Sequence, residues 1–170
     1  MKTLIITKDD IDSEGFYKAQ SLDFDGDVEI NENLGVVKFK GFIRARLSIN
    51  AKAGSGIEAG IGIEAGWGIE AGWGLKAVWG IKAGSGIKAG WGIKAGSGIE
   101  AGSGIDAGRG IDAGWGINAG SGIKAGWGID AGGGIKAGSG IKAGLSIHAK
   151  YISCGLRIFA GTSIYKIQSD

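Results

Sequence analysis

Residues 87–98 read Ile-Lys-Ala-Gly-Trp-Gly-Ile-Lys-Ala-Gly-Ser-Gly, which is one six-residue unit written twice. The unit Ile-x-Ala-Gly-z-Gly continues from Ile57 to Ile147, and its first slot holds fifteen Ile and one Leu in sixteen consecutive units. A six-residue period excludes an α-helix, whose apolar residues recur every ~3.6 positions. Short fixed periods are typical of solenoids, in which each unit stacks only on its neighbours. We therefore predict an all-β solenoid.

Alternation along a strand assigns an inside and an outside to each unit. Ile and Ala point the same way and form the core, whereas the polar residue x between them faces solvent. The Gly-z-Gly segment is the bend, where glycine permits close backbone approach. Val78 occupies the first glycine slot and Ser146 the second. Val78 indicates that its slot does not strictly require a positive φ.

The charges at x predict how many units close one coil. Residues one coil apart stack ~4.8 Å apart, where opposite charges attract and like charges repel. A spacing of 18 residues gives seven opposite pairs and three like pairs, whereas a spacing of 12 gives six and five. We therefore predict a triangular β-helix with about 18 residues per coil. The seven opposite pairs are Glu58/Lys76, Glu64/Lys82, Lys82/Glu100, Glu70/Lys88, Lys88/Asp106, Asp106/Lys124 and Lys94/Asp112.

This repeat resembles that of the hexapeptide-repeat left-handed β-helix proteins, whose coils are also triangular. The resemblance covers about 130 residues and implies a left-handed helix. It departs from the family pattern two positions before the aliphatic residue, where Ser or Trp replaces the family's small residue. Runs such as Gly92–Gly98 also resemble small proteins carried by phages and other mobile elements, some of which inhibit bacterial defence systems such as CRISPR.

Composition divides the chain into four segments. The first holds nine acidic and three basic residues with strand patterns at 3–7 and 22–30, and the second holds five basic residues and no acidic ones. After Ile147 the six-residue spacing slips by one position. Solenoids need caps because an open end exposes core and unpaired backbone. We predict an acidic N-terminal cap at 1–36, a basic transition at 37–56, the regular solenoid at 57–147, and irregular C-terminal coils with a cap at 148–170.

Little in the sequence indicates catalysis, a cofactor or a metal. His148 is the only candidate for the general base of a hexapeptide-repeat acyltransferase, and a three-histidine zinc site is excluded because His148 is the only histidine. Asp23, Asp25 and Asp27 suggest a calcium loop, but the full ligand spacing is missing and a solvated strand face is the favoured interpretation. Cys154 falls in the Ala slot and is expected in the core. We expect a protein that is not an enzyme.

All six Trp residues occupy the z slot at the bends. Three indoles in one coil cannot share an interior filled by Ile and Ala, so we predict that they lie outside. There they either shield glycine-rich backbone or form a recognition surface, since exposed Trp and Arg are frequent interface hot spots. With 18 residues per coil, one edge is aromatic with an arginine, reading Ser55, Trp73, Trp91, Arg109, Trp127 and Leu145, whereas Trp79 and Trp115 fall on another.

We therefore expect a non-enzymatic protein that binds or inhibits a macromolecular partner, either a protein or a protein–nucleic-acid complex. Lys38, Lys40, Arg44 and Arg46 form a basic stripe that either binds nucleic acid directly or is neutralised by the acidic cap. The alternatives are a self-assembling structural repeat and an acyltransferase-like enzyme. Without a signal peptide or membrane span in the sequence, we expect a monomer or small closed oligomer in the cytoplasm of a bacterial host.

Overall fold

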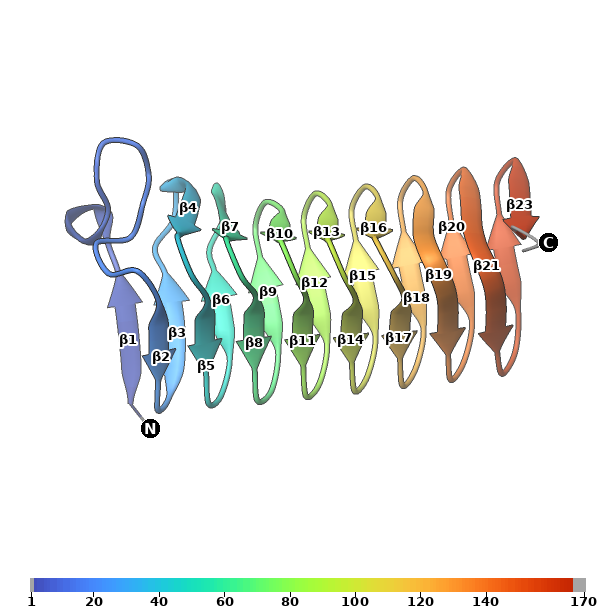
Figure 1. Cartoon of the computed structure of the whole chain (residues 1–170), viewed down its shortest axis with the longest axis horizontal. Coiled ribbons are helices and arrows are strands. Elements are labelled where there is room, and N and C mark those ends of the chain that lie inside the picture. Colours follow the sequence, from blue (N-terminus) through green and yellow to red (C-terminus); the bar gives the residue numbers. More distant parts are fainter. Residues whose placement is uncertain (1, 167–170) are drawn as a thin grey trace.

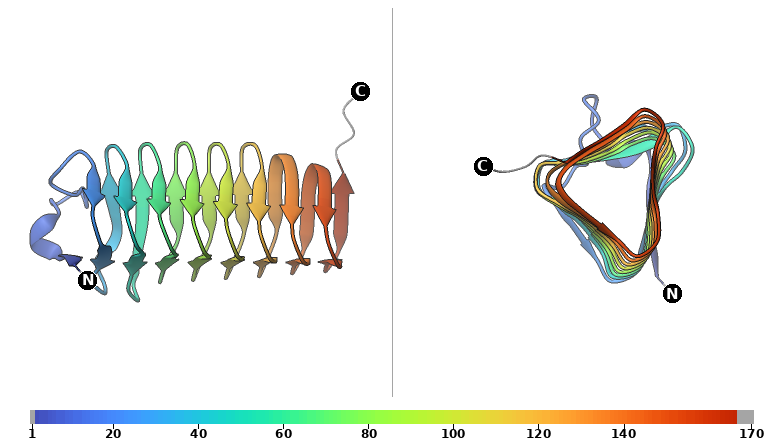
Figure 2. Two further views of the ribbon diagram at one scale, coloured as in Figure 1. Left: turned by 90° about the horizontal axis from the view of Figure 1, so that it is seen from below. Right: turned by 90° about the vertical axis from the view of Figure 1, so that its right-hand side faces the viewer.

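The structure is a computed structural model that describes the backbone of residues 2–166 and the side chains of residues 2–162. Short strands wind into a straight rod of stacked coils (Figure 1). Viewed along its axis the rod is a triangle (Figure 2), with a parallel sheet on each face and a bend at each corner. The predicted all-β triangular solenoid is confirmed.

Three faces form the walls, joined by hydrogen bonds between successive coils. Face 1 is a nine-stranded sheet of β1 (Thr3–Ile6), β3 (Asp27–Ile30), β6 (Ile49–Ala51), β9 (Ile69–Ala71), β12 (Ile87–Ala89), β15 (Ile105–Ala107), β18 (Ile123–Ala125), β20 (Ile141–Ala143) and β22 (Ile158–Ala160). Face 2 comprises β4 (Gly35–Phe39), β7 (Ser55–Ala59), β10 (Leu75–Ala77), β13 (Ile93–Ala95), β16 (Ile111–Ala113), the first parts of β19 (Ile129–Ala137) and β21 (Ser146–Cys154), and β23 (Ser163–Lys166).

Face 3 completes the triangle. It comprises β2 (Leu22–Phe24), β5 (Ile43–Ala45), β8 (Ile63–Ala65), β11 (Ile81–Ala83), β14 (Ile99–Ala101), β17 (Ile117–Ala119) and the second parts of β19 and β21. Because β19 and β21 run unbroken around one corner, they join faces 2 and 3 into a single hydrogen-bonded sheet.

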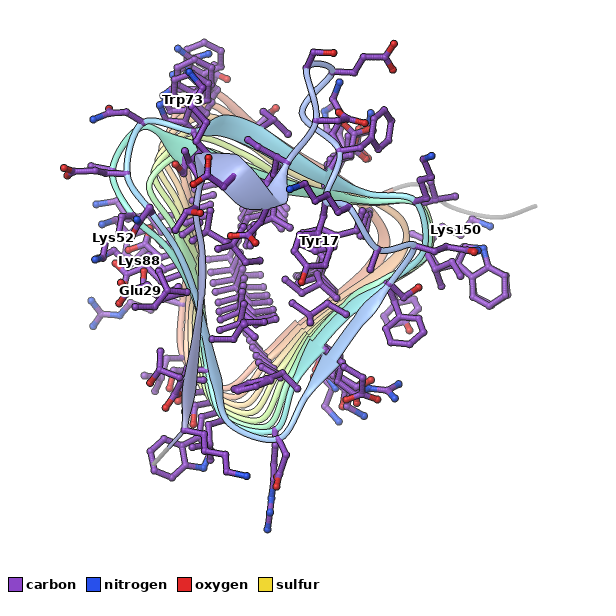
Figure 3. The ribbon with its side chains drawn as sticks, turned by 90° about the vertical axis from the view of Figure 1, so that its left-hand side faces the viewer. Tyr17, Glu29, Lys52, Trp73, Lys88 and Lys150 are labelled. Carbon is purple, nitrogen blue, oxygen red and sulfur yellow. The ribbon has the colours of Figure 1, made fainter. Side chains whose placement is uncertain are left out.

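The core is a stack of identical layers. In the regular coils the Ile or Leu and the Ala of each strand are buried, with at most 3% of each side chain exposed, while the residue between them faces outward. Figure 3 shows the inward side chains as a regular comb inside the triangle. Each buried Ile contributes roughly 1.5–3 kcal/mol. This offsets the large entropy cost of ordering a glycine-rich chain.

The coil length follows the predicted charge ladder. Lys76 pairs with Glu58, a separation of 18 residues, and all seven predicted opposite pairs lie side by side in register. The three like pairs also face each other, so the ladder is favourable on balance but not optimised. Five of the seven form ion pairs: Lys76–Glu58 at 2.8 Å, Lys82–Glu100 at 3.6 Å, Lys88–Glu70 at 3.0 Å, Lys94–Asp112 at 2.7 Å and Lys124–Asp106 at 3.7 Å.

The helix is right-handed, so the left hand implied by the family resemblance is wrong. Ile81, whose side chain points inward, donates its N–H to Gly98 of the next coil at 3.1 Å, and the Ala83 carbonyl also points to the next coil. For an L-residue these directions fix the turn as right-handed. In Figure 3, seen from the N-terminal end, the chain accordingly passes clockwise from the face of Lys88, past the corner of Trp73, toward the corner beside Lys150. Parallel strands strongly favour such right-handed connections, and a six-residue period carries no information about hand.

The two glycines of the bend have different roles. Neither has a positive φ in the regular coils, as Val78 indicated; among the described residues the left-handed glycines are Gly15, Gly35 and Gly54. A Cβ at the first glycine, as at Gly102, would overlap with the carbonyl oxygen of the coil before it. At the second glycine, as at Gly104, the nearest atom would lie 3.2 Å away. An added methyl group would therefore meet a closer neighbour at the first glycine than at the second, although Val78 occupies the first slot and still donates its N–H to the Ala59 carbonyl at 3.1 Å.

The solenoid extends into both terminal segments. Strands β1, β2 and β3 pair with later coils, so the parallel ladders begin within residues 1–36. The loop after β1, with the short 3-10 helix η1 (Lys8–Asp10), covers the N-terminal end, where Tyr17 packs on Phe39 at 5.1 Å. The predicted slip after Ile147 is confirmed, since Ile141 pairs with Ile158. In that last coil Ile152, Cys154 and Ile158 are only partly buried.

We expect Ile99→Asp to unfold the protein, because it places an unpaired charge inside the stack. The expected loss is about 4 kcal/mol or more, measured by urea denaturation. Asn118→Asp is the matched control, since it adds the same carboxylate on the outer side of the next coil of that face, and its effect should stay within about 0.5 kcal/mol. A stably folded Ile99→Asp protein, or far-ultraviolet dichroism dominated by helix, would contradict this architecture.

Alanine substitutions at the two glycine slots should differ in their effect on the stability of the fold. We expect Gly102→Ala to destabilise the fold by about 1–3 kcal/mol, because the added methyl group overlaps with the neighbouring coil. Gly104→Ala should cost less than about 1 kcal/mol, since its methyl group is nearly accommodated and the substitution also restricts the unfolded chain. Thermal denaturation of the two variants, which differ by two positions in one bend, measures the difference. Equal effects would contradict the assigned roles.

Candidate binding surface

The corners of the triangle present the z side chains to solvent. In the regular units each z residue lies between two glycines, except Trp79 after Val78 and Leu145 before Ser146, and its side chain projects from the corner. Five of the six Trp residues are exposed and Trp73 is half-buried, which confirms that the indoles lie outside the core. Stacking of the coils aligns these residues into three rows along the rod.

The first row is a stacked ladder, which we call the aromatic–arginine edge. It comprises Trp73, Trp91, Arg109, Trp127 and Leu145, between faces 1 and 2, and Figure 3 shows Trp73 projecting from this corner. The indoles of Trp73 and Trp91 stack with centroids 5.2 Å apart and planes 9° from parallel. The guanidinium of Arg109 lies 4.4 Å from the Trp91 ring and 5.2 Å from the Trp127 ring. These contacts order a long, flexible arginine side chain.

The edge begins at Trp73, one coil later than the sequence indicated. The sequence predicts Ser55 as the first residue of the row, but its side chain is buried. Its hydroxyl donates to the Asn31 carbonyl at 2.7 Å and accepts from the Leu34 N–H at 3.0 Å. Two extra residues in this coil form a wider bend with Gly54 at φ +74°, which turns Ser55 inward. Ser55 therefore stabilises the bend and does not contribute to the surface.

Arg109 carries the unpaired charge of this surface. Among the described residues no carboxylate forms an ion pair with it, and both faces of its guanidinium contact indoles. A groove along face 2 runs beside the edge and is also lined by Glu58, Lys76, Lys94, Asp112, Asp130 and His148. Lys76 pairs with Glu58 and Lys94 with Asp112, and the hydrogen bond from Lys94 to Asp112, followed by their charge interaction, raises the pKa of Lys94. The edge of the guanidinium remains available to a partner.

The other Trp residues do not join this surface. Trp79 and Trp115 lie on the corner between faces 2 and 3, together with Ile61, Ser97, Gly133 and Tyr151. In the third row, between faces 3 and 1, Trp67 follows Leu47 and is followed by Ser85, Ser103, Ser121 and Ser139. The predicted binding residues thus separate into two aromatic rows on different corners.

The basic stripe is paired with the acidic segment beside it. Arg44 bonds to Asp23 at 3.4 Å and to Glu64 at 3.0 Å, and Arg46 bonds to Asp25 at 2.8 Å. The hydrogen bond from Arg46, and then its charge, hold the pKa of Asp25 below its ordinary value.

The two lysines of the stripe lie against the N-terminal loop. Lys38 donates to the Glu14 carbonyl at 3.0 Å, and both Lys38 and Lys40 lie over the ring of Phe16, at 5.2 and 5.5 Å. Together with the arginine pairs, these contacts favour an outward strand face neutralised by the cap over a phosphate-binding stripe.

The groups considered for catalysis or metal binding are dispersed. His148 lies on the surface of face 2, with Nδ1 3.9 Å from an Asp130 oxygen. Asp23 and Asp25 bond to separate arginines, and Asp27 accepts the Ser48 N–H at 3.1 Å. Within the described residues, no three His, Cys, Asp or Glu side chains are placed to hold a metal ion.

Comparison with protein-family models, curated proteins and solved structures gives no match, so function has to be inferred from this geometry. Over the part of the chain that the structure describes, no helix has the length and apolar character to cross a membrane.

Proposed function

We propose that this protein is a non-enzymatic binding protein, a rigid solenoid that docks on a macromolecular partner through the aromatic–arginine edge. The observation that carries the proposal is Arg109 held between Trp91 and Trp127, exposed at a corner and without a carboxylate partner among the described residues. Tryptophan and arginine are the side chains most enriched at interface hot spots. The partner would be a protein or a protein–nucleic-acid complex.

The asymmetry of the corners supports this proposal. The same bend accepts Ser at 85, 103, 121 and 139, so the core and the backbone do not require aromatic residues at a corner. Folding therefore does not explain why this corner carries Trp73, Trp91 and Arg109. The alternative is that the indoles shield the backbone, but shielding would be needed equally at the serine-bearing corner.

Rigidity adds to the suitability of the edge for binding. The backbone beneath each rung is fixed by hydrogen bonds to both neighbouring coils, as in the bonds from Arg109 N–H to Trp91 and from Trp127 N–H to Arg109. Stacking restricts the side chains as well. A surface that is already ordered loses less conformational entropy when a partner binds.

The class of partner rests on the resemblance of the repeat to proteins of phages and mobile elements. On that basis we propose an inhibitor of a bacterial defence complex, of the anti-CRISPR type, acting in the cytoplasm of the host cell. Inhibition by occupying a surface needs no catalytic group, which agrees with the dispersed positions of His148 and the carboxylates.

Self-assembly is the second candidate, because Ile152, Cys154 and Ile158 are only partly buried in the last described coil. Incompletely covered core residues favour contact with another apolar surface. Sedimentation over a range of concentrations distinguishes the two. A concentration-independent monomer or small closed oligomer agrees with a binding protein, and open-ended growth would favour a structural role.

We expect Trp91→Ala and Arg109→Ala each to weaken partner binding by about 2 kcal/mol or more. The melting temperature should change little, since neither side chain lies in the core. The partner is first captured with the wild-type protein from host or phage-infected cells, and its affinity for each purified variant is then measured.

Ser103→Ala and Ser121→Ala, at the same slot on the serine-bearing corner, are the controls and should bind normally. Loss of stability with unchanged binding in the Trp91 variant would show that the indoles shield the backbone and that the interface lies elsewhere.

A further inference from the structure

The corner between faces 2 and 3 carries a second aromatic row with a different pattern. From one coil to the next the residues alternate between aromatic and small, in the order Trp79, Ser97, Trp115, Gly133 and Tyr151. The three aromatic side chains are 66%, 75% and 60% exposed. Because small residues separate them, successive rings lie two coils apart, at about 9.6 Å.

The ring faces of this row are not occupied by one another. In the part of the chain that the structure describes, no ring stacking and no cation–ring contact involves Trp79, Trp115 or Tyr151. This contrasts with the aromatic–arginine edge, where Trp91 has Trp73 on one face and Arg109 on the other. The first edge therefore presents mainly ring edges, whereas this row can present ring faces.

Tyr151 lies flat against the rod. A Cβ added to Gly134 would overlap with the ring atoms of Tyr151, and Gly134 is buried beneath that ring. The register also shifts between Ala131 and Gly134 along β19, where this contact occurs. The absence of a side chain at Gly134 thus lets the ring lie against the backbone with its other face outward.

A polar strip without a dominant charge runs parallel to this row. The groove along face 3 is lined by Trp79, Trp115 and Tyr151 and also by Lys82, Glu100 and Asn118. Lys82 lies 3.6 Å from Glu100, so these two charges largely cancel. Arg44 and Glu64, which also line the groove, pair at 3.0 Å, so among the described residues Lys136 is the one charge of the lining without an ion pair, and a single cation attracts a chain of phosphates only weakly. Amide, carboxylate and ammonium groups can each bond to hydroxyl groups.

We propose that this corner binds an uncharged, extended β-linked polysaccharide. The axial C–H groups of a pyranose ring pack on the negative face of an aromatic ring. In an extended β-1,4-linked chain, alternate sugars turn the same face to one side, and two sugars advance by about as much as two coils of the rod. Trp79, Trp115 and Tyr151 would contact every second sugar, and Lys82, Glu100 and Asn118 would bond to the hydroxyls.

This surface is separate from the aromatic–arginine edge, and neither proposal depends on the other. Trp67 provides a matched control, because it occupies the same slot at another corner, is 55% exposed and has no aromatic residue in the next four units of its row. Ser97 provides a test of spacing. A ring at position 97 would fill the interval between Trp79 and Trp115, and its bulk would displace the sugar chain that runs across that interval.

The experiment measures binding of cellohexaose and chitohexaose by isothermal titration calorimetry, with maltohexaose, an α-linked chain of different shape, as the ligand control. We expect both β-linked hexaoses to bind and maltohexaose not to bind. Trp79→Ala and Trp115→Ala should each weaken binding about tenfold, as loss of one stacking platform does. Trp67→Ala and Trp91→Ala should bind like wild type.

Ser97→Trp should abolish binding even though it adds an aromatic residue, with dichroism confirming that the variant is folded. The proposal is overturned if neither β-linked hexaose binds at millimolar concentration, if maltohexaose binds equally well, or if Ser97→Trp binds as tightly as wild type. Binding of an oligothymidine strand that depends on Trp115, without hexaose binding, would assign the row to nucleic acid instead.

Discussion

The hydrogen-bonded stacking of one coil on the next is the constraint on which the rest of the structure depends. In every regular coil the backbone N–H groups of inward residues donate hydrogen bonds to the following coil. Carbonyl groups at the bends accept hydrogen bonds from the preceding coil. A Cβ in the first glycine slot of most units would overlap with the coil before it, although Val78 is accommodated in that slot. Glycine thus serves these bends by lacking a side chain, and not by adopting unusual dihedral angles. The buried Ile and Ala then stabilise the stack, because hydrogen bonds alone would not order so flexible a chain.

This arrangement separates folding from surface chemistry. Inside, Ile and Ala are repeated with little variation, whereas outside the x and z slots accept charged, polar, small or aromatic residues. The x slots are coupled between coils by charge, and the exposed ion pairs there contribute little each. The z slots are coupled between coils by stacking. A single solenoid can therefore carry surfaces of different chemistry on its three corners without altering the core.

Stacking determines what each corner can bind. Where aromatic residues occupy successive coils, as Trp73 and Trp91 do, they contact each other and leave ring edges exposed. Where small residues intervene, as Ser97 does between Trp79 and Trp115, the rings remain apart. Arg109 shows a third arrangement, in which a cation replaces an indole within the ladder. The same slot yields three kinds of surface according to what lies one coil away.

The sequence by itself determined the solenoid, its core, its outward indoles and its coil length. Two signals repeated many times along the chain carry this information: a strict six-residue period, and complementary charges 18 residues apart, as at Glu58 and Lys76. Only the tertiary structure decided the hand, since the period is the same for either turn and the direction of the Ile81 N–H is needed to choose. It also decided that Ser55 points inward and that Arg44 and Arg46 pair with Asp23 and Asp25, since these contacts depend on wider bends and on segments distant in the chain. The division of the aromatic residues into a stacked edge and a spaced row follows from the same cause, because neighbours one coil apart meet only after the chain has closed its triangle.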